Sequence, residues 1–386
     1  MIDISYMWKL NTNHFTFWDR LKICKFFLNS DNFWTYGKQV QQFEQKMADY
    51  VGSKYALFVS SGSTANTLIA YYLDQVETRK KIIFPAVTWA TSITPFIKCG
   101  FEPVFVDVTL DSLSMDLDQV EKILKRDDGK EIGTIFITAL LGIAPDINRL
   151  KQIEKTYNVR VMLDSCESTF TNHNGKNIAS LFTSTTSTYF GHMLQSVEGG
   201  FVFTNDEKEY EMFNMIRNHG MYRHLPPKNQ EKYRNPKVDR LFDFYCIGNN
   251  FRNTDINAFI GQLDFNRVPQ YTAHRKTCGE LYMSLLNESK FYKINLKTED
   301  NLFSLPIIAK NKESMESIKT YCRSHNIEYR PIIGGNLLKQ TAFKKYAKGK
   351  KFPNADLINE NGMYVGLHYS VDQKQIKKFV GAINKF

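Results

Sequence analysis

Short apolar strands alternate with helix-forming stretches between residues 55 and 164 of this 386-residue chain. The predicted strands cover residues 55–60, 81–84, 103–107, 134–138 and 159–164. This alternation is typical of a mostly parallel sheet that helices cover on both faces. Ligands bind such sheets beyond the carboxyl ends of the strands, so that edge is where a functional site is expected.

Polar and aromatic side chains follow several of these strands. Residues 60–66 are mostly Ser, Gly, Thr and Asn, and they join a strand to a helix. Free amides at such a helix start suit an anion, although a plain helix cap explains the same residues equally well. Trp89, Thr138 and residues 164–167 follow later strands. The sequence therefore predicts a pocket that these strand ends line.

The chain is predicted to have three parts. Residues 1–37 are aromatic-rich and irregular, with aromatic rings that are buried or face a partner. Residues 38–288 form the large α/β domain, and residues 289–386 form a small α+β domain. Further predicted elements are helices over 38–50, 207–218, 313–325, 338–346 and 354–361, a polar loop over 225–240, one long helix from about 250 to 286, and strands over 302–308, 327–331 and 363–367.

Composition limits the classes of function. The formal net charge is +10, which indicates either a lysine-rich C-terminal surface or attraction of an anionic substrate such as a nucleotide diphosphate. The sequence contains no basic run that is interleaved with aromatic residues, and such a run would be the sign of nucleic-acid binding. The six cysteines are dispersed, without metal or iron–sulfur spacing, which predicts no metal site and a reducing cytoplasm. No apolar window approaches the roughly 20 residues that cross a bilayer.

The segment 187–200 contains the residue with the most specific chemistry. His192 lies six residues before Glu198, which two glycines and the apolar strand 201–204 follow. Paired glycines before a strand let the backbone turn sharply and approach a ligand. No lysine occurs between Lys176 and Lys208. An imidazole can move a proton near neutral pH, so His192 is a candidate acid and base.

Together these motifs resemble the DegT/DnrJ/EryC1/StrS family of sugar aminotransferases from about residue 35 to residue 385. The resemblance implies an aspartate-aminotransferase-like fold (fold type I) that binds pyridoxal 5′-phosphate. A family lysine six residues before Glu-Gly-Gly bonds covalently to this cofactor, but here that position is His192. The chain therefore looks like a 3-dehydratase of a nucleotide-linked 4-keto-6-deoxyhexose, with GDP as the expected nucleotide. Pyridoxamine 5′-phosphate, L-glutamate as amino donor and a homodimer are also implied.

The resemblance assigns a role to each matched residue. His192 is the expected catalytic acid and base. The residues expected to hold the cofactor are Gly62, Ser63, Trp89, Asp164, Glu167, Ser187 and Asn250, with Asn250 completing the phosphate site of a partner subunit. The residues expected to bind substrate are His219, Arg223 and Arg252. Glu167 either bonds near the cofactor or positions a neighbour, and His219 is either a site contact or a structural histidine.

Two other functions stay open. An ordinary nucleotide-sugar aminotransferase needs an amine to hold its cofactor, and the missing lysine argues against it. A catalytically inactive homologue that only binds a ligand need keep none of Trp89, Asp164, Ser187 and Glu198, and all four are present. The 3-dehydratase is therefore the favoured hypothesis.

Overall fold

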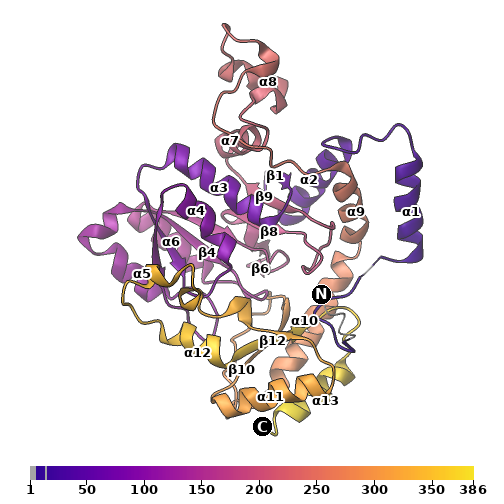
Figure 1. The fold of residues 1–386 in the computed structure, drawn as a ribbon, viewed down its shortest axis with the longest axis vertical. Helices are drawn as coiled ribbons and strands as arrows, with labels where there is room; N and C mark the ends of the chain where they lie inside the picture. Colours follow the sequence, from indigo (N-terminus) through magenta and orange to yellow (C-terminus); the bar gives the residue numbers. More distant parts are fainter. Residues whose placement is uncertain (1–5, 14) are drawn as a thin grey trace.

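The computed structural model describes residues 6–13 and 15–386, and its largest element is a seven-stranded sheet between two layers of helices (Figure 1). The strands lie in the order β1 (Tyr55–Val59), β9 (Gly200–Thr204), β8 (Thr183–Ser187), β5 (Arg160–Asp164), β4 (Ile132–Thr138), β2 (Lys81–Pro85) and β3 (Glu102–Val106). Neighbours from β8 to β3 are parallel, whereas β9 is antiparallel to β1 and β8. The predicted mostly parallel mixed sheet is confirmed.

Helices surround this sheet and a second, smaller one. Their bounds are α1 (Phe17–Leu28), α2 (Lys38–Val51), α3 (Gly62–Val76), α4 (Thr94–Lys98), α5 (Leu117–Leu124), α6 (Ile147–Tyr157), α7 (Glu207–Arg217), α8 (Pro227–Gln230), α9 (Asp255–Phe265), α10 (Val268–Leu285), α11 (Lys312–Ser324), α12 (Pro353–Asn361) and α13 (Gln373–Ile383). A two-residue hairpin pairs β6 (Asn172–His173) with β7 (Lys176–Asn177).

Apolar side chains pack against both faces of the large sheet. Ile135 and Ile137 of β4 lie in the core that α5 and α6 complete. Phe136 lies on the opposite face, where its ring centroid is 4.8 Å from that of Phe96 in α4. Because side chains alternate between the faces of a strand, a strand buried on both faces is apolar throughout.

Strand β8 differs from its neighbours because every residue in it carries a hydroxyl group. Buried hydroxyls need hydrogen-bond partners. Thr185 donates to the Asn66 side chain at 2.7 Å, and Ser184 donates to the Ala179 carbonyl oxygen at 2.6 Å. The bond from Thr185 holds β8 against α3, and the bond from Ser184 holds it against the turn Ile178–Ser180. Ser187, the last residue of β8, lies at the carboxyl edge of the sheet.

The small sheet has three antiparallel strands in the order β10 (Ser304–Ile308), β12 (Gly362–Gly366) and β11 (Tyr329–Arg330). The core around this sheet contains side chains of α11, α12 and α13. The predicted small α+β part is therefore confirmed, whereas the boundaries after residues 37 and 288 stay a prediction. Residues 7–10 also pack here, because Trp8 forms a β-bridge with Ile327 and its ring stacks edge-on with Phe379.

The N-terminal segment is not irregular, as the sequence analysis expected, because it contains the helix α1. The Thr16 side chain accepts from the Asp19 amide while the Asp19 side chain accepts from the Thr16 amide, which is a capping box. The sequence analysis missed this capping box because the many aromatic residues obscure the apolar periodicity of the helix. Most of the aromatic rings of this N-terminal segment are not buried in the single chain: Phe17 and Trp18 are 67% and 70% exposed. Helix α1 lies at the edge of the molecule in Figure 1, where Phe26 stacks on Phe259 of α9 with a centroid distance of 4.6 Å and Asp19 forms an ion pair with Arg267.

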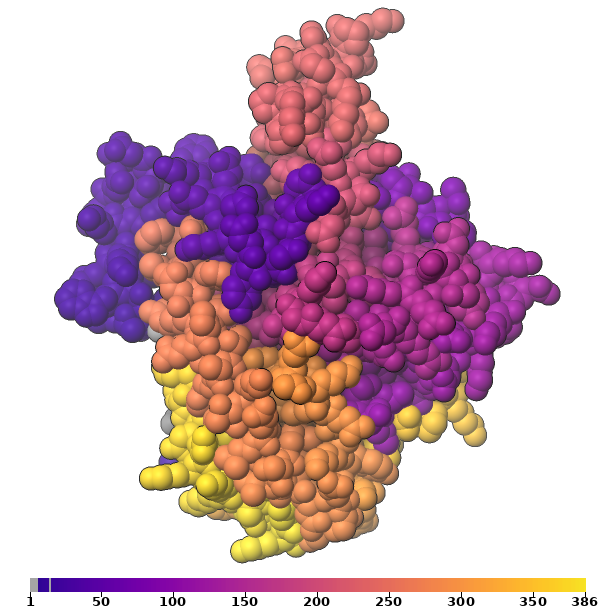
Figure 2. Space-filling view, turned by 180° about the vertical axis from the view of Figure 1, so that it is seen from behind, coloured from indigo at the N-terminus to yellow at the C-terminus, as the bar shows by residue number. Residues whose placement is uncertain are grey.

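Three other expectations about elements were wrong. The long helix to residue 286 is divided into α9 and α10 at Asn266 and Arg267, because Pro269 cannot continue the hydrogen-bond ladder of α9. The helix expected near 338–346 is two 3₁₀ turns, Leu337–Lys339 and Lys344–Ala347. The loop 225–240 contains the short helix α8, and this region projects clear of the body (Figure 2).

No helix within the described part of the chain combines the length and the apolar character that a bilayer span requires.

A buried arginine connects two helices to strand β1 of the large sheet. Arg217, the last residue of α7, is fully buried and forms an ion pair with Glu44 of α2. Its guanidinium also donates to the Phe58 carbonyl oxygen at 3.0 Å and to the Tyr36 hydroxyl at 2.5 Å. Because the Glu44 carboxylate also accepts from the Phe58 amide, the two charges lock α7, α2 and β1 to one another.

We predict that Arg217→Met lowers the free energy of unfolding by about 3 kcal/mol or more, because it leaves the Glu44 carboxylate without its cation. Adding Glu44→Gln removes that uncompensated charge and keeps an acceptor for the Phe58 amide, so the double variant should regain part of the loss. Urea unfolding of the three proteins measures both effects. A double variant less stable than Arg217→Met would contradict this account.

Candidate functional site

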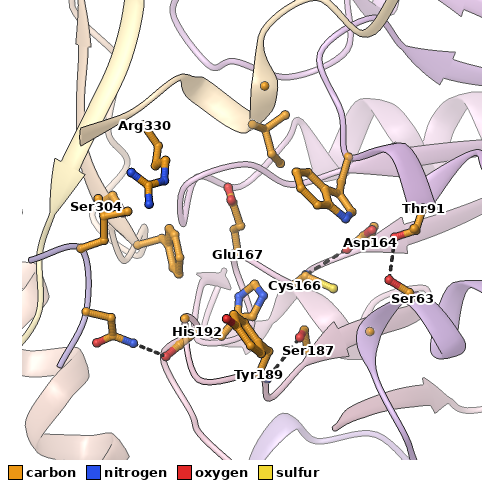
Figure 3. A pocket seen from close by; sticks show the side chains of 18 of the residues that line it. Ser63, Thr91, Asp164, Cys166, Glu167, Ser187, Tyr189, His192, Ser304 and Arg330 are labelled. Atoms are coloured by element: carbon orange, nitrogen blue, oxygen red, sulfur yellow. Dashed lines mark hydrogen bonds between the residues drawn. The ribbon is translucent and has the colours of Figure 1, made fainter. Parts of the chain in front are cut away.

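A cavity of about 690 Å³ lies between the carboxyl edge of the large sheet and the small sheet. Loops after β1, β2, β5 and β8 form one wall, and residues 303–304, 328–334 and 364 form the other. The predicted site residues that line it are Gly62, Ser63, Trp89, Asp164, Glu167, Ser187 and His192 (Figure 3). The structure thus brings together seven positions that are spread over 130 residues of sequence.

Asp164 ends β5 at the base of the cavity. One carboxylate oxygen accepts from the Asn66 side chain at 2.9 Å and from the Ser92 hydroxyl at 2.6 Å. The other oxygen accepts from the Cys166 amide at 3.0 Å. Three donors stabilise a buried negative charge, so this carboxylate is suited to hold a cationic group in the cavity.

The start of α3 offers donors to an anion. The Ser61 hydroxyl caps the helix by accepting from the Thr64 amide, which leaves the amides of Gly62 and Ser63 without intrahelical partners. A Cβ atom on Gly62 would lie 2.8 Å from the Cβ of Ser187. Only glycine therefore lets Ser187, at the end of β8, approach the start of the helix this closely.

His192 lies in the loop after β8, and in Figure 3 its ring lies in the cavity beside Tyr189 and Glu167. Burial lowers the pKa of His192 to about 4, although the negative charge of Asp164 acts in the opposite direction. Its Nδ1 atom is buried and has no hydrogen-bond partner among the described residues. The imidazole is therefore neutral at pH 7 and can take a proton.

Glu167 is a second titratable group in the cavity. Burial, together with a smaller effect of the charge of Asp164, raises the pKa of Glu167 to about 7. One oxygen accepts from the Leu141 amide at 2.9 Å, so the side chain both faces the cavity and positions a neighbouring loop. A carboxyl group with this pKa can exchange a proton near neutrality.

The remaining predicted residues do not line this cavity. Asn250, His219 and Arg252 contact one another instead: Arg252 donates to the Asn250 side chain at 3.0 Å, and its guanidinium is 3.3 Å from His219 Nε2. Arg223 donates to the Leu241 carbonyl oxygen at 2.6 Å. Burial, Arg223 and Arg252 together lower the pKa of the nearby His224 to about 4, which marks a strongly positive region.

Several lining residues were missed by the sequence analysis. They come from the N-terminal segment, from the loops and from the small sheet: Leu10, Asn11, Thr91, Tyr189, Ser304, Glu328, Arg330 and Tyr364. Arg330 is the one arginine, and no lysine occurs, among the described residues that line the cavity. Its guanidinium pairs with Glu328 at 2.8 Å. No local pattern marks these residues, because the packing of the small sheet against the large one brings them to the cavity.

Comparison with known proteins gives consistent results. Residues 19–384 match the sequence profile of the DegT/DnrJ/EryC1/StrS aminotransferase family. The GDP-4-keto-6-deoxy-D-mannose 3-dehydratase of Yersinia pseudotuberculosis is 30% identical over 370 residues, which are 92% of this chain and 93% of that protein. The same enzyme from Escherichia coli, solved with bound hydrated PLP, superposes with a TM-score of 0.89 at 26% identity, over 98% of this chain and 99% of that one.

A further structure of GDP-4-keto-6-deoxymannose 3-dehydratase contains a trapped PLP–glutamate geminal diamine. Its TM-score is also 0.89 at 26% identity, and the match covers 97% of this chain and all of that one. The expected aminotransferase-like fold is therefore confirmed.

The raised pKa of Glu167 predicts a pH dependence of stability. Because folding raises this pKa from 4.5 to about 7, the free energy of unfolding falls as pH rises through this window. Glu167→Gln cannot ionise and keeps an acceptor for the Leu141 amide. We expect the stability of the variant relative to wild type to be roughly 3 kcal/mol greater at pH 8 than at pH 4.5. Urea unfolding of the ligand-free proteins measures this difference, and an equal difference at both pH values would show that Glu167 ionises normally.

Proposed function

The chain belongs to the DegT/DnrJ/EryC1/StrS aminotransferase family, and from this membership we propose that it is a pyridoxamine phosphate-dependent 3-dehydratase of a nucleotide-linked 4-keto-6-deoxyhexose. One observation carries the proposal: the cavity contains His192, and no lysine lines it within the described residues. Covalent attachment of an aldehyde cofactor requires an amine, whereas an imidazole only moves protons. GDP is proposed as the nucleotide and L-glutamate as the amino donor, from the names of the relatives.

The cavity fits pyridoxal 5′-phosphate and pyridoxamine 5′-phosphate. The amides of Gly62 and Ser63 and the hydroxyl of Ser187 would hold the phosphate at the start of α3. Asp164, with its three donors, would hold the protonated ring nitrogen, and Trp89 offers a flat face to the ring. When bound, pyridoxamine phosphate supplies an amine for the C4 ketone of the sugar and a conjugated ring that accepts electrons.

His192 would move the protons of the reaction. Its neutral imidazole, with Nδ1 free of hydrogen bonds within the described chain, accepts a proton. The charge of Asp164 raises the pKa of His192, so it stabilises the imidazolium that results. The imidazolium can then give its proton to the departing C3 hydroxyl, which leaves as water. The small sheet forms one wall of the cavity and would shield the reacting atoms from bulk water on that side.

Cationic groups would bind the anionic parts of the substrates. Arg330 faces the cavity from β11 and suits a phosphate or a carboxylate, because its guanidinium forms paired hydrogen bonds with such groups. We also propose a homodimer in which Asn250, His219, Arg223 and Arg252 act in the cavity of the partner subunit. Their separation from the cavity of their own chain supports this arrangement.

We propose that the protein works in the cytoplasm. All six cysteines in the described chain are free thiols, as a reducing compartment would keep them.

Product analysis tests the reaction. Incubation with a GDP-linked 4-keto-6-deoxyhexose, pyridoxal phosphate and L-glutamate should give a 4-keto-3,6-dideoxy sugar, and CDP-linked sugar serves as the comparison. A 4-amino sugar as the product would instead identify an aminotransferase. Cofactor binding with neither product would identify an inactive homologue.

His192 variants test the role of the imidazole. His192→Ala should lower kcat by on the order of 10²–10⁴-fold, because it removes general acid–base assistance, and should leave cofactor binding intact. His192→Lys should bond covalently to pyridoxal phosphate and give a yellow protein that borohydride fixes. Both variants keep Asp164 and the residues proposed to hold the phosphate. Cofactor absorbance is therefore the control that each variant still binds the cofactor. A loss below about tenfold in the alanine variant removes His192 from this role.

Mixing two inactive variants tests the shared site. Asp164→Asn and Asn250→Ala should each inactivate the homodimer if every cavity uses the Asn250 of the partner. In a mixed dimer one cavity then has both residues intact, so random reassociation should restore about one quarter of the wild-type activity. No restoration after confirmed subunit exchange would place Asn250 outside the partner's cavity.

A further inference from the structure

Residues 7–12 connect the small sheet to the loop that carries His192. At the small sheet, the Trp8 indole donates to the Gly366 carbonyl oxygen at 2.9 Å, and the Leu10 amide donates to the Glu328 carboxylate at 3.0 Å. A Cβ atom on Gly366 would lie 2.2 Å from the Lys9 carbonyl oxygen. The segment therefore lies directly against β12, at a place where only glycine leaves it room.

At the other end of this segment, one side chain bonds to the backbone on both sides of Gly191. The side-chain nitrogen of Asn11, Nδ2, donates to the Phe190 carbonyl oxygen at 2.7 Å and to the His192 carbonyl oxygen at 3.2 Å. The next residue, Thr12, accepts from the Gln195 side chain at 3.2 Å. Leu10 and Asn11 also line the cavity, so the segment forms part of its wall.

The backbone of the His192 loop needs such support. Between β8 and β9 the described chain has no helix or strand, and the His192 amide makes one turn bond, to the Tyr189 carbonyl oxygen at 2.9 Å. The loop is anchored again only after His192, where the Gln195 amide donates to Asp264 at 2.9 Å and the Ser196 amide donates to the Thr188 carbonyl oxygen at 2.8 Å. The ring itself is not held through Nδ1. The imidazole also interacts with the Cys166 backbone, and its centroid is 5.7 Å from that of Phe303, so these groups orient the ring. The place from which the ring projects is set by the backbone of His192, and that backbone is bonded to Asn11.

We propose that Asn11 is a positioning residue for His192, and that it places the imidazole by fixing the carbonyl groups of Phe190 and His192. The inference rests on the proposed function, because it assigns Asn11 to the proton transfer of that reaction. Glu328 extends the arrangement, since its carboxylate accepts from Leu10 and also pairs with Arg330. A chain of direct contacts thus joins the cavity arginine to the base.

Three variants of the full-length protein test this role. Asn11→Ala should lower kcat about 10- to 100-fold with little change in KM, since a misplacement of about 1 Å costs on the order of 100-fold. Asn11→Asp should be worse at neutral pH, because its carboxylate repels two carbonyl oxygens. Its activity relative to Asn11→Ala should rise as pH falls and the carboxyl group gains a donor hydrogen. Asn13→Ala is the matched control, because Asn13 is not among the residues that line the cavity and its side chain accepts from the nearby Phe15 amide at 2.8 Å.

A readout independent of turnover separates this inference from the proposed function. Histidine-labelled protein, with and without pyridoxamine phosphate, gives the pH titration of His192 by NMR, and His192→Ala assigns its signal. Asn11→Ala should move the midpoint of this titration toward that of an ordinary histidine, and Asn13→Ala should not. If His192→Ala keeps full turnover, the proposed role of His192 fails, yet a moved midpoint still supports positioning by Asn11.

Three results overturn the inference. The first is an Asn11→Ala protein with wild-type kcat and a wild-type His192 titration. The second is an equal loss of kcat in Asn11→Ala and Asn13→Ala. The third is an Asn11→Asp protein that matches Asn11→Ala at every pH, because direct bonding to the two carbonyl oxygens requires the charge to matter.

Discussion

A negative charge inside the protein is the constraint on which the cavity depends. The carboxylate of Asp164 lies below the protein surface and is stable there because three donors meet it. Those donors come from α3, from the turn after β2 and from the residues that follow β5, so the same bonds align three loops at the edge of the sheet. The charge also acts on the two titratable neighbours, since it raises the pKa values of both Glu167 and His192. Burial lowers the pKa of His192 by more than Asp164 raises it, so the imidazole is neutral. Burial and Asp164 both raise the pKa of Glu167, so its carboxyl group is easy to protonate.

The two walls of the cavity have different chemistry. The large sheet supplies hydroxyls, amides and a carboxylate, which suit a small phosphorylated ring. The small sheet supplies Arg330, Glu328, Ser304 and Tyr364, which suit a larger polar substrate. The matched family is named for aminotransferases and the relatives of this chain include a 3-dehydratase. Among the described residues that line the cavity there is no lysine, and position 192 is a histidine.

Much of the large sheet could be predicted from sequence, because strands buried on both faces are continuously apolar and the turns between them are polar. The half of the site that these strand ends supply was predictable for the same reason. Arg330 and Asn11 were not, because they reach the cavity through long-range packing that leaves no local pattern. Helix α1 was missed although its capping box is visible at Thr16 and Asp19, since aromatic residues obscured the periodicity. The position of Asn250 outside the cavity of its own chain agrees with the resemblance, which implied that this residue serves a partner subunit. Arg252 was expected to bind substrate, and no local pattern in the sequence indicates that it lies away from the cavity of its own chain.

The close fit of residues 9 and 10 against Gly366 bears on how the protein should be handled in the laboratory. A label attached at position 9 or 10 would press on β12 and on the cavity wall together, because Leu10 and Asn11 also line the cavity. Probes for binding experiments are therefore better placed on side chains remote from this contact.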